Sequence, residues 1–396
     1  MIIVTGLAGR SALDKVLAIR GGAELVALWA QLGSVLDLVA AVALSGIGMG
    51  LSVLVIQATH PDDQRRLLRE AISLGLGASF PVLVFLCVAA WGFGERLAAG
   101  ALPPWLIAMS ALAGWIVIIP GMLNSYWLGQ QRRDFMLGLA FLSAVLPLVA
   151  AVGVPAGQVL PFVAFASAAP ALVAVLLLRK AGAPAPSLEH RRAGRRALLH
   201  YLIPGVAIGI LSPASMVAAR AVVSDAMSWQ DAGHLQAIWR VSDWVASVAG
   251  GVISVYFLPR LTATLETPAF QRELRRAAQL TVVPAALAFA VMFVFQRSIL
   301  AWLYDESFRI SDTAVALFFL GSLVRIAAWI PLFALYAMKR TGAITAGEFL
   351  SLPLFALLLA VFSRSLDLER ASVLWFASYL VYGTFNYWAA RPTART

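Results

Sequence analysis

The sequence predicts an all-α integral membrane protein with twelve transmembrane helices arranged as two six-helix bundles. Three observations carry this prediction: the composition, the number of long apolar segments and the placement of the positive charges. Hydrophobic residues make up 61% of the 396 residues and charged residues only 13%, and the mean hydropathy is +0.84. Soluble domains are typically about 45–50% apolar, so a chain of this composition is expected to lie in lipid.

A helix needs about 20 predominantly apolar residues to cross a bilayer. Between clusters of charge and proline we expect such spans at 1–20, 25–58, 69–93, 103–129, 134–154, 157–178, 197–224, 230–260, 274–297, 311–338, 342–363 and 370–390. The second and eighth are longer than a bilayer requires and are expected to tilt or protrude. The first segment contains charged residues and ends without a small-residue cleavage site, which favours a membrane helix over a signal peptide.

The positive charges alternate between the two sides of the membrane. With a cytoplasmic amino terminus, 19 of the 30 Lys and Arg residues fall in inner connections and five fall within spans. The outer connections hold only Arg20, Arg96, Arg297, Arg309, Arg364 and Arg370. Cytoplasmic loops carry the excess of basic residues in membrane proteins. We therefore expect a multi-pass membrane protein with both termini in the cytoplasm.

An internal repeat relates the two halves of the chain. Residues 61–69 and 268–276 share proline, glutamine, arginine, leucine and arginine at a constant offset of 207, and Asp37 and Asp243 lie 206 apart in the long helices that precede them. Six-span halves in the same orientation imply parallel repeats about an axis along the membrane normal. We expect an N-terminal bundle over 1–180, a cytoplasmic linker over 181–196 and a C-terminal bundle over 197–396.

Five basic side chains lie inside predicted spans: Arg10, Lys15, Arg220, Arg240 and Arg325. A charge at the centre of a bilayer costs several kcal/mol or more, so such residues normally face a partner or a water-filled path. Spacing of one turn predicts that Arg10 pairs with Asp14, and that Arg240 pairs with Asp243. Lys15 points to another face of its helix.

Arg220 and Arg325 have no carboxylate within one turn of their own helices. We therefore expect a cationic chamber for an anionic cargo, with Lys15, Arg220, Arg325 and Arg240 as the substrate-binding residues. The static alternative is pairing between helices, for example of Asp37 with Lys15. Asp37 and Asp243 are the candidates for coupling transport to protons or sodium ions.

Catalytic and metal-binding functions are not supported by the sequence. Carboxylates do not cluster, the four histidines are scattered, and Cys87 is the single cysteine. The phosphate-binding pattern Gly-x-x-x-x-Gly-Lys-Ser/Thr is absent, so the chain is not expected to hydrolyse ATP. We expect no catalytic residue, no metal and no cofactor. The net charge of +10 is explained by the inner loops, so nucleic acid is not an expected partner.

Several motifs carry a family resemblance. Residues 228–233 read Ser-Trp-Gln-Asp-Ala-Gly and are followed by Gln236, Ser242-Asp243 and Ser-Val-Tyr-Phe-Leu-Pro-Arg-Leu over 254–261. This region resembles the seventh and eighth helices of bacterial polysaccharide flippases. The resemblance is to the lipid III flippase and O-antigen translocase branch of the multidrug/oligosaccharidyl-lipid/polysaccharide exporter superfamily. Lys15 and Arg220 match basic residues of that family, and Arg325 corresponds to a lysine.

The resemblance implies a transporter that flips an undecaprenyl-diphosphate-linked oligosaccharide from the cytoplasmic to the periplasmic leaflet by alternating access. Such transport serves surface polysaccharide assembly, as for O-antigen or enterobacterial common antigen. The implied partners are this glycolipid, membrane lipid, a polysaccharide polymerase and chain-length proteins. Arg240 and Trp244 replace smaller residues of the family, so the sugar accommodated is expected to differ.

Three alternatives stay open. An ion-coupled multidrug exporter of the same superfamily would act on cationic drugs and would favour an acidic interior. A twelve-helix facilitator of another fold often carries Gly-x-x-x-Asp-Arg-x-Gly-Arg after its second helix, and residues 62–66 lack both glycines. A non-transporting scaffold of a polysaccharide-assembly complex would tolerate loss of every buried charge.

Overall fold

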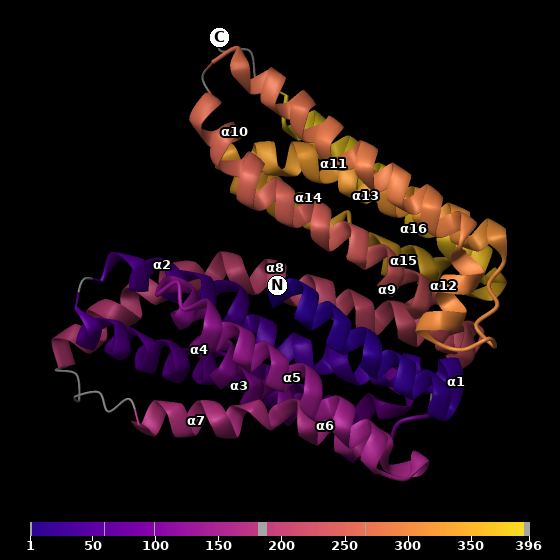
Figure 1. The fold of residues 1–396 in the computed structure, drawn as a ribbon, viewed down its shortest axis with the longest axis horizontal. Coiled ribbons are helices and arrows are strands. Elements are labelled where there is room, and N and C mark those ends of the chain that lie inside the picture. The colour runs from indigo at the N-terminus through magenta and orange to yellow at the C-terminus, as the bar shows by residue number, and fades with distance from the viewer. Residues whose placement is uncertain (1, 59, 99, 181–187, 266, 392–396) are drawn as a thin grey trace. The chain divides into compact units, whose positions relative to one another are not determined.

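The computed structural model describes residues 2–58, 60–98, 100–180, 188–265 and 267–391, which form sixteen α-helices and no strand. The chain divides into two compact units, Met1–Val217 and Ala218–Thr396, drawn in Figure 1. The division falls inside the long helix α8, Leu188–Ala226. The bundle boundaries expected on either side of a 181–196 linker stay a prediction, and residues 181–187 of that linker lie outside the described residues.

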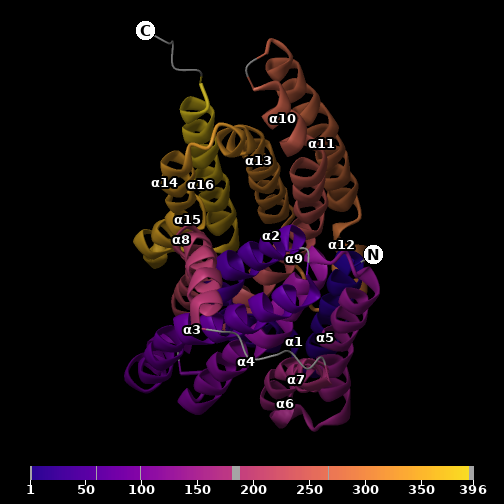
Figure 2. The same cartoon turned by 90° about the vertical axis from the view of Figure 1, so that its left-hand side faces the viewer.

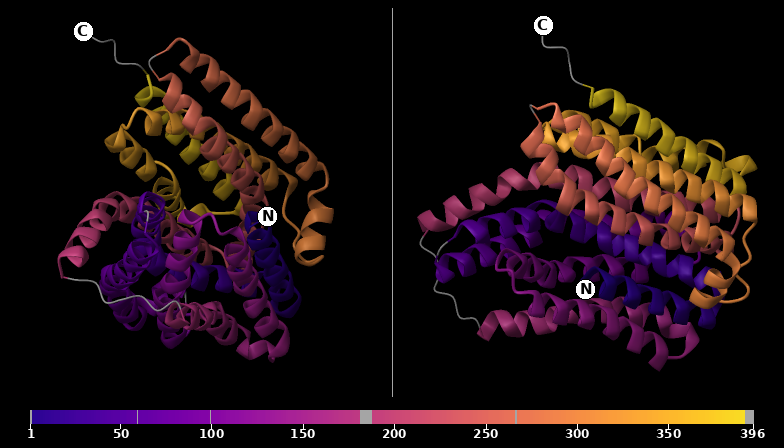
Figure 3. Two further views of the ribbon diagram at one scale, coloured as in Figure 1. Left: turned by 60° about the vertical axis from the view of Figure 1, so that its left-hand side comes forward. Right: turned by 45° about the horizontal axis from the view of Figure 1, so that its top comes forward.

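The helices that precede α8 belong to the first unit. They are α1 (Ile2–Ala43), α2 (Met49–Gln57), α3 (Pro61–Ala98), α4 (Pro104–Gly129), α5 (Arg133–Gly153), α6 (Val159–Ala168) and α7 (Pro170–Lys180). The helices that follow α8 belong to the second unit. They are α9 (Trp229–Val252), α10 (Leu258–Thr264), α11 (Ala269–Val294), α12 (Gln296–Leu303), α13 (Asp312–Ala337), α14 (Thr341–Phe349), α15 (Leu352–Val361) and α16 (Leu368–Ala389). Figures 2 and 3 show the helices of each unit lying side by side.

Helix α1 is a hairpin of two antiparallel spans. Gly21 and Gly22 have non-helical backbone angles, and Gly22 adopts φ 65°, ψ −161°, a combination open essentially to glycine alone. A continuous helix would hold Arg10 and Asp37 about 40 Å apart at 1.5 Å per residue, yet their side chains lie 3.6 Å apart. The reversal is visible in Figure 1. The predicted spans at 1–20 and 25–58 are therefore separate crossings.

With this hairpin, six spans can be traced in each half of the described chain. Nine helical stretches meet the length and hydropathy of a membrane span, and the first of them, Thr5–Gln57, contains both arms of the hairpin. Helices α8 and α16 complete the set of twelve, at the positions predicted for the seventh and twelfth spans. The protein is thus an all-α multi-pass membrane protein with twelve transmembrane helices in two six-helix bundles.

The internal repeat extends through most of each half, with offsets of 207 to 209 residues. Helix α4 spans Pro104–Gly129 and α13 spans Asp312–Ala337. Helix α5 covers Arg133–Gly153, and α14 with α15 covers Thr341–Val361. A short π-helical segment interrupts the second long span of each half, at Leu44–Gly48 and Ile253–Phe257. The two halves thus repeat helix lengths and local irregularities as well as the motif at 61–69.

The turn after the central helix shows the repeat at single-residue detail. Gln131 and Lys339 are 208 residues apart, and among the described residues they alone have positive φ without being glycine, at 59° and 57°. The amides of Arg132 and Arg340 donate to the carbonyls of Trp127 and Leu335 at 3.0 Å in both copies. The same sharp turn therefore joins α4 to α5 and α13 to α14.

Helices α4 and α13 lie at the centre of their bundles. Helix α4 packs against α1, α2, α3, α5, α6 and α7, and α13 packs against α9, α10, α11, α14 and α16. Close approach depends on small residues. A Cβ on Gly114 of α4 would lie 2.3 Å from the carbonyl oxygen of Leu36 in α1, and a Cβ on Gly321 of α13 would lie 2.5 Å from the Trp375 ring in α16.

Three differences from the predicted spans have physical causes. Helices α3, α8 and α11 begin five to nine residues before the predicted apolar segments, because charged turns continue a helix beyond the hydrocarbon region. The sixth and eleventh spans are broken, at Ala169–Pro170 and Leu350–Ser351. The ninth span ends at Val294, and α12 begins at Gln296 after a non-helical Phe295.

Candidate substrate-binding residues

Helix α9 presents a polar stripe in the second unit. Its start is fixed by Ser228, whose Oγ accepts a hydrogen bond from the Asp231 amide at 3.0 Å, as an N-cap does. Gln236, Arg240 and Asp243 follow at positions i, i+4 and i+7, which place them on one face over about 10 Å of helix. We call these three residues the α9 stripe.

Arg220 joins one end of the α9 stripe. It lies on α8, its side chain is 2% exposed, and its Nη1 donates to Oε1 of Gln236 at 2.9 Å. Because the amide of Gln236 is neutral, this hydrogen bond orients the guanidinium without cancelling its charge. The glutamine is itself buried, so the contact is shielded from solvent.

Arg325 joins the other end of the α9 stripe. It lies on α13 and is 7% exposed, and its Nη2 approaches Oδ1 of Asp243 to 2.6 Å, a short charge-assisted hydrogen bond. The rings of Trp329, Trp375 and Tyr379 have centroids 5.4, 5.6 and 5.9 Å from its guanidinium carbon. These distances are within the range of cation–π attraction. The arginine is thus held by one carboxylate and three aromatic rings.

Arg240 stands between these two contacts on the α9 stripe. It is half-buried, one helical turn from Gln236 and one turn from Asp243. Three of the four predicted substrate-binding residues, Arg220, Arg240 and Arg325, are therefore brought to one face of α9. Arg220 contacts that face at Gln236, and Arg325 contacts it at Asp243.

The first unit holds the remaining candidates on the α1 hairpin. Arg10 lies on the first arm and Asp37 on the second, with Nη2 and Oδ2 3.6 Å apart and both side chains about half exposed, at 51% and 53%. Lys15 is half-buried one turn further along the first arm, and Asp14 is 1% exposed. The ion pair shown for Asp37 is with Arg10, whereas the static alternative had paired it with Lys15.

The two repeat-related aspartates share one feature. Asp37 is bound to Arg10 within the first unit, and Asp243 is bound to Arg325 within the second. Spacing along single helices had suggested Asp14 as the partner of Arg10 and Arg240 as the partner of Asp243. The observed pairs join residues 27 and 82 positions apart in the sequence. They could therefore not be predicted from the spacing of residues along one helix.

Sequence reasoning missed four residues that surround the candidate cations. Gln236 lies one turn before Arg240, and Trp329 lies one turn after Arg325, so both follow a detectable i,i+4 spacing. Trp375 and Tyr379 come from α16. Because α16 meets α13 only in the folded bundle, no local pattern could have identified them.

No family model matches this sequence, and no curated protein matches it. Solved structures share its fold. An inward-facing multidrug resistance MATE family transporter of the MOP superfamily has a TM-score of 0.76 at 11% identity, covering 99% of this chain and 94% of that one. The lipid II flippase MurJ in an inward closed conformation has a TM-score of 0.68 at 13% identity, covering 98% and 85%.

A third neighbour is a MOP superfamily transporter from Pyrococcus furiosus, with a TM-score of 0.63 at 12% identity over 98% of this chain and 94% of that one. It is described by a reversed polarity of its binding pocket that suggests a different function. At these identities the likeness concerns the fold. The chain therefore has the fold of the transporters and flippases of the MOP superfamily.

Proposed function

We propose that this protein flips an undecaprenyl-diphosphate-linked oligosaccharide across the bacterial inner membrane by alternating access, for surface polysaccharide assembly. The observation that carries this proposal is that three arginines, Arg220, Arg240 and Arg325, meet one face of α9. A dehydrated diphosphate requires cationic hydrogen-bond donors, so a face rich in arginine suits an anionic cargo better than a cationic drug.

Arg220 and Arg240 are the residues proposed to hold the diphosphate. The hydrogen bond that Arg220 donates to Oε1 of Gln236 fixes the orientation of its guanidinium. Arg240 is half-buried on the same helix face. Arginine suits this role because its planar donors match phosphate oxygens. Lys15 is proposed as a further substrate-binding residue.

Arg325 and Asp243 are proposed to link cargo binding to ion exchange. Their 2.6 Å contact occupies the guanidinium while Asp243 is ionised. Protonation of Asp243 would remove the carboxylate charge and release Arg325 to bind the anionic cargo. Asp37 is the corresponding candidate in the first unit, where it holds Arg10.

The alternative function is an ion-coupled multidrug exporter. It is favoured by the highest TM-score among the neighbours named above, which belongs to a transporter described as multidrug resistance. The flippase proposal is favoured by the three arginines that meet at α9 and by the MurJ neighbour, described as a lipid II flippase. Partner proteins such as a polymerase and chain-length proteins remain part of the proposal.

The proposal is tested with Arg220→Gln and Arg240→Gln in cells that lack the chromosomal copy. A lost charge-assisted contact is worth about 1.5–3 kcal/mol, so transport is expected to fall about tenfold or more. The measurement is the amount of undecaprenyl-linked glycan that accumulates, determined by mass spectrometry. Arg364→Gln is the matched control, because Arg364 is an exposed arginine between α15 and α16.

Expression of each variant in the membrane is quantified in the same cells. Accumulation of undecaprenyl-linked glycan in the Arg220→Gln and Arg240→Gln variants, with normal export in the Arg364→Gln variant, supports a diphosphate-binding role. Normal glycan levels in all three variants, together with a loss of resistance to cationic drugs in the deletion strain, would contradict the flippase proposal and favour the exporter.

A further inference from the structure

The repeated turn differs between its two copies in what its arginine contacts. In the second unit, Arg340 donates through Nη1 to the carbonyls of Ala389 and Arg391 at the end of α16. In the first unit, the guanidinium carbon of Arg132 lies 4.4 Å from the centroid of the Phe135 ring. Among the described residues, Arg132 has no side-chain hydrogen bond and no ion pair. The position equivalent to Phe135 is Ala343, so the second copy has no ring to hold its arginine in the same way.

Arg132 borders a polar pocket of about 470 Å³ at the end of α4, lined also by Gln64, Gln130 and Gln131. Two of the lining glutamines are hydrogen-bonded. Gln64 donates through Nε2 to the Ala58 carbonyl at 2.8 Å, and Gln130 donates through Nε2 to Oε1 of Gln64 at 2.8 Å. Because these amides are already engaged with one another, Arg132 is the cationic group available to an anion at this pocket.

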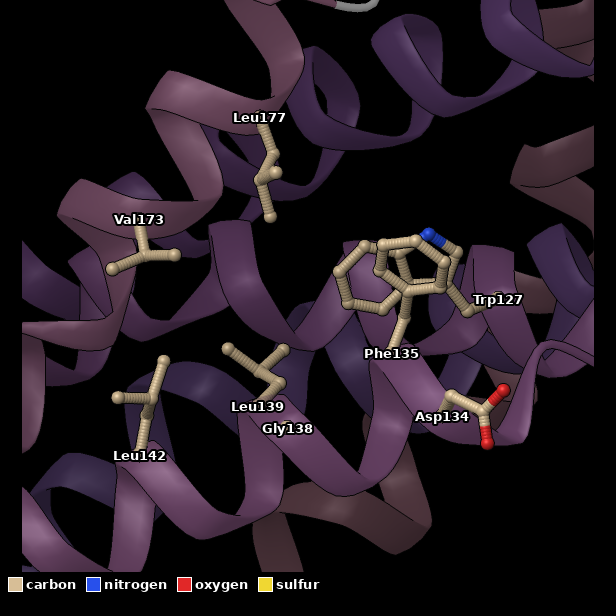
Figure 4. Close-up of a pocket in the computed structure, with 8 residues that line it drawn as sticks. All are labelled: Trp127, Asp134, Phe135, Gly138, Leu139, Leu142, Val173 and Leu177. Carbon is tan, nitrogen blue, oxygen red and sulfur yellow. The ribbon is translucent and has the colours of Figure 1, made fainter.

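An apolar groove of about 430 Å³ begins on the other side of Phe135. Its walls come from α4, α5 and α7, and Figure 4 shows Leu139, Leu142, Val173 and Leu177 converging on it. These helices belong to candidate membrane spans, and Asp134 is the one charged residue in the lining of the groove. Its size and lining suit an alkyl chain.

Phe135 connects the two features. Its ring lies beneath the guanidinium of Arg132 and 5.1 Å from the centroid of Trp127, which lines the groove. A polar pocket with a cation at its rim is thereby joined to an apolar groove. Asp134 lies at this end of the groove and is exposed, as is Arg133, so the turn keeps one net positive charge among residues 132–134.

We propose that this site binds a glycerophospholipid with an anionic headgroup, with its phosphate on Arg132 and one acyl chain in the apolar groove. Basic sites beside transmembrane helices attract anionic headgroups, and the adjoining groove selects a ligand that carries an alkyl chain. The site belongs to the first unit alone and does not depend on the proposed transport cargo. Its occupant is a resident lipid that stabilises the turn between α4 and α5.

The test uses the purified full-length protein in detergent and native mass spectrometry with phosphatidylglycerol or phosphatidylethanolamine of identical chains. Arg132→Gln is expected to weaken phosphatidylglycerol binding about tenfold and phosphatidylethanolamine binding less, because the ammonium group of phosphatidylethanolamine already compensates its phosphate. Arg133→Gln removes the same charge one residue away, outside the pocket lining, and is expected to change binding less than threefold.

A second variant tests the groove. A Cβ at Gly138 meets no atom within 4 Å, so Gly138→Leu fits the helix while its side chain fills the groove, and it is expected to weaken binding of both lipids. Wild-type phosphatidylglycerol binding by both Arg132→Gln and Gly138→Leu overturns the proposal. Displacement of phosphatidylglycerol by an equal concentration of undecaprenyl phosphate also overturns it, because the site would then serve a polyprenyl ligand.

Discussion

At the scale of single residues, the pair of Arg325 and Asp243 has a larger energetic role than the pair of Arg10 and Asp37. Arg325 is 7% exposed, so its charge has little access to solvent and depends on the carboxylate of Asp243 and on the aromatic rings. The side chains of Arg10 and Asp37 are about half exposed. Removing one partner of a buried pair leaves an uncompensated charge, whereas exposed pairs contribute little to stability.

Asp243→Asn is therefore expected to lower the free energy of unfolding by about 3 kcal/mol. Asp37→Asn is the matched control, with an expected loss below about 1 kcal/mol. Combining Asp243→Asn with Arg325→Met is expected to recover much of the loss, because no buried charge remains. The measurement is the unfolding transition of the protein in lipid nanodiscs. Equal losses of unfolding free energy in Asp243→Asn and Asp37→Asn would show that the pair of Arg325 and Asp243 does not stabilise the protein more than the pair of Arg10 and Asp37.

The identities of the buried cations could be predicted from the sequence, but their partners could not. A charged residue inside an apolar segment is visible by composition alone, which was sufficient to select Lys15, Arg220, Arg240 and Arg325. The carboxylate of Asp243 reaches Arg325 only because α9 packs against α13. Contacts of this kind depend on how helices are placed in the bundle.

At the scale of elements, the reversal of α1 depends on Gly22. Its φ of 65° and ψ of −161° are sterically closed to residues with a Cβ. No neighbouring atom lies within 4 Å of a Cβ built at this position, so a substitution there would cause backbone strain without a packing clash. Gly21 and Gly22, the two non-helical residues of α1, bring the arms of the hairpin close enough for Arg10 to reach Asp37.

Gly22→Ala is expected to lower stability by about 1–3 kcal/mol through backbone strain. Gly33→Ala is the control, because Gly33 is helical and a Cβ there also meets nothing within 4 Å. Alanine is favoured over glycine inside a helix by about 1 kcal/mol, so this variant is expected to be neutral or stabilising. The measurement is the melting temperature of both variants in the same detergent. Equal melting temperatures for Gly22→Ala and Gly33→Ala would exclude strain at Gly22.

Helix positions were predictable where proline or charge bounds an apolar segment. The span predicted at 103–129 is α4, Pro104–Gly129, and the span predicted at 311–338 is α13, Asp312–Ala337. The π-helical segment Leu44–Gly48 and the break at Leu350–Ser351 leave no trace in hydropathy. Such irregularities arise from packing between helices. The average composition of a segment does not depend on that packing, so it cannot predict them.

At the scale of the whole molecule, the orientation of the twelve spans in the membrane has two possibilities. Fixing the side of one loop fixes the side of every other loop. The repeat places six spans in each half, so both termini lie on one side, and the charge bias predicts that this side is the cytoplasm. Helix α11 provides a direct test, because Gln271 lies near its start and Glu306 follows the short helix after its end. Both side chains are exposed.

Cys87 is the single cysteine, so Cys87→Ser gives a cysteine-free background for labelling with a membrane-impermeant maleimide. Glu306→Cys is expected to react in intact spheroplasts, and Gln271→Cys only after permeabilisation, because Arg272, Arg275 and Arg276 hold that end of α11 on the inner side. The reverse pattern would invert every loop assignment. A cargo assembled in the cytoplasm would then first meet the helix ends that the charge bias assigns to the outer side.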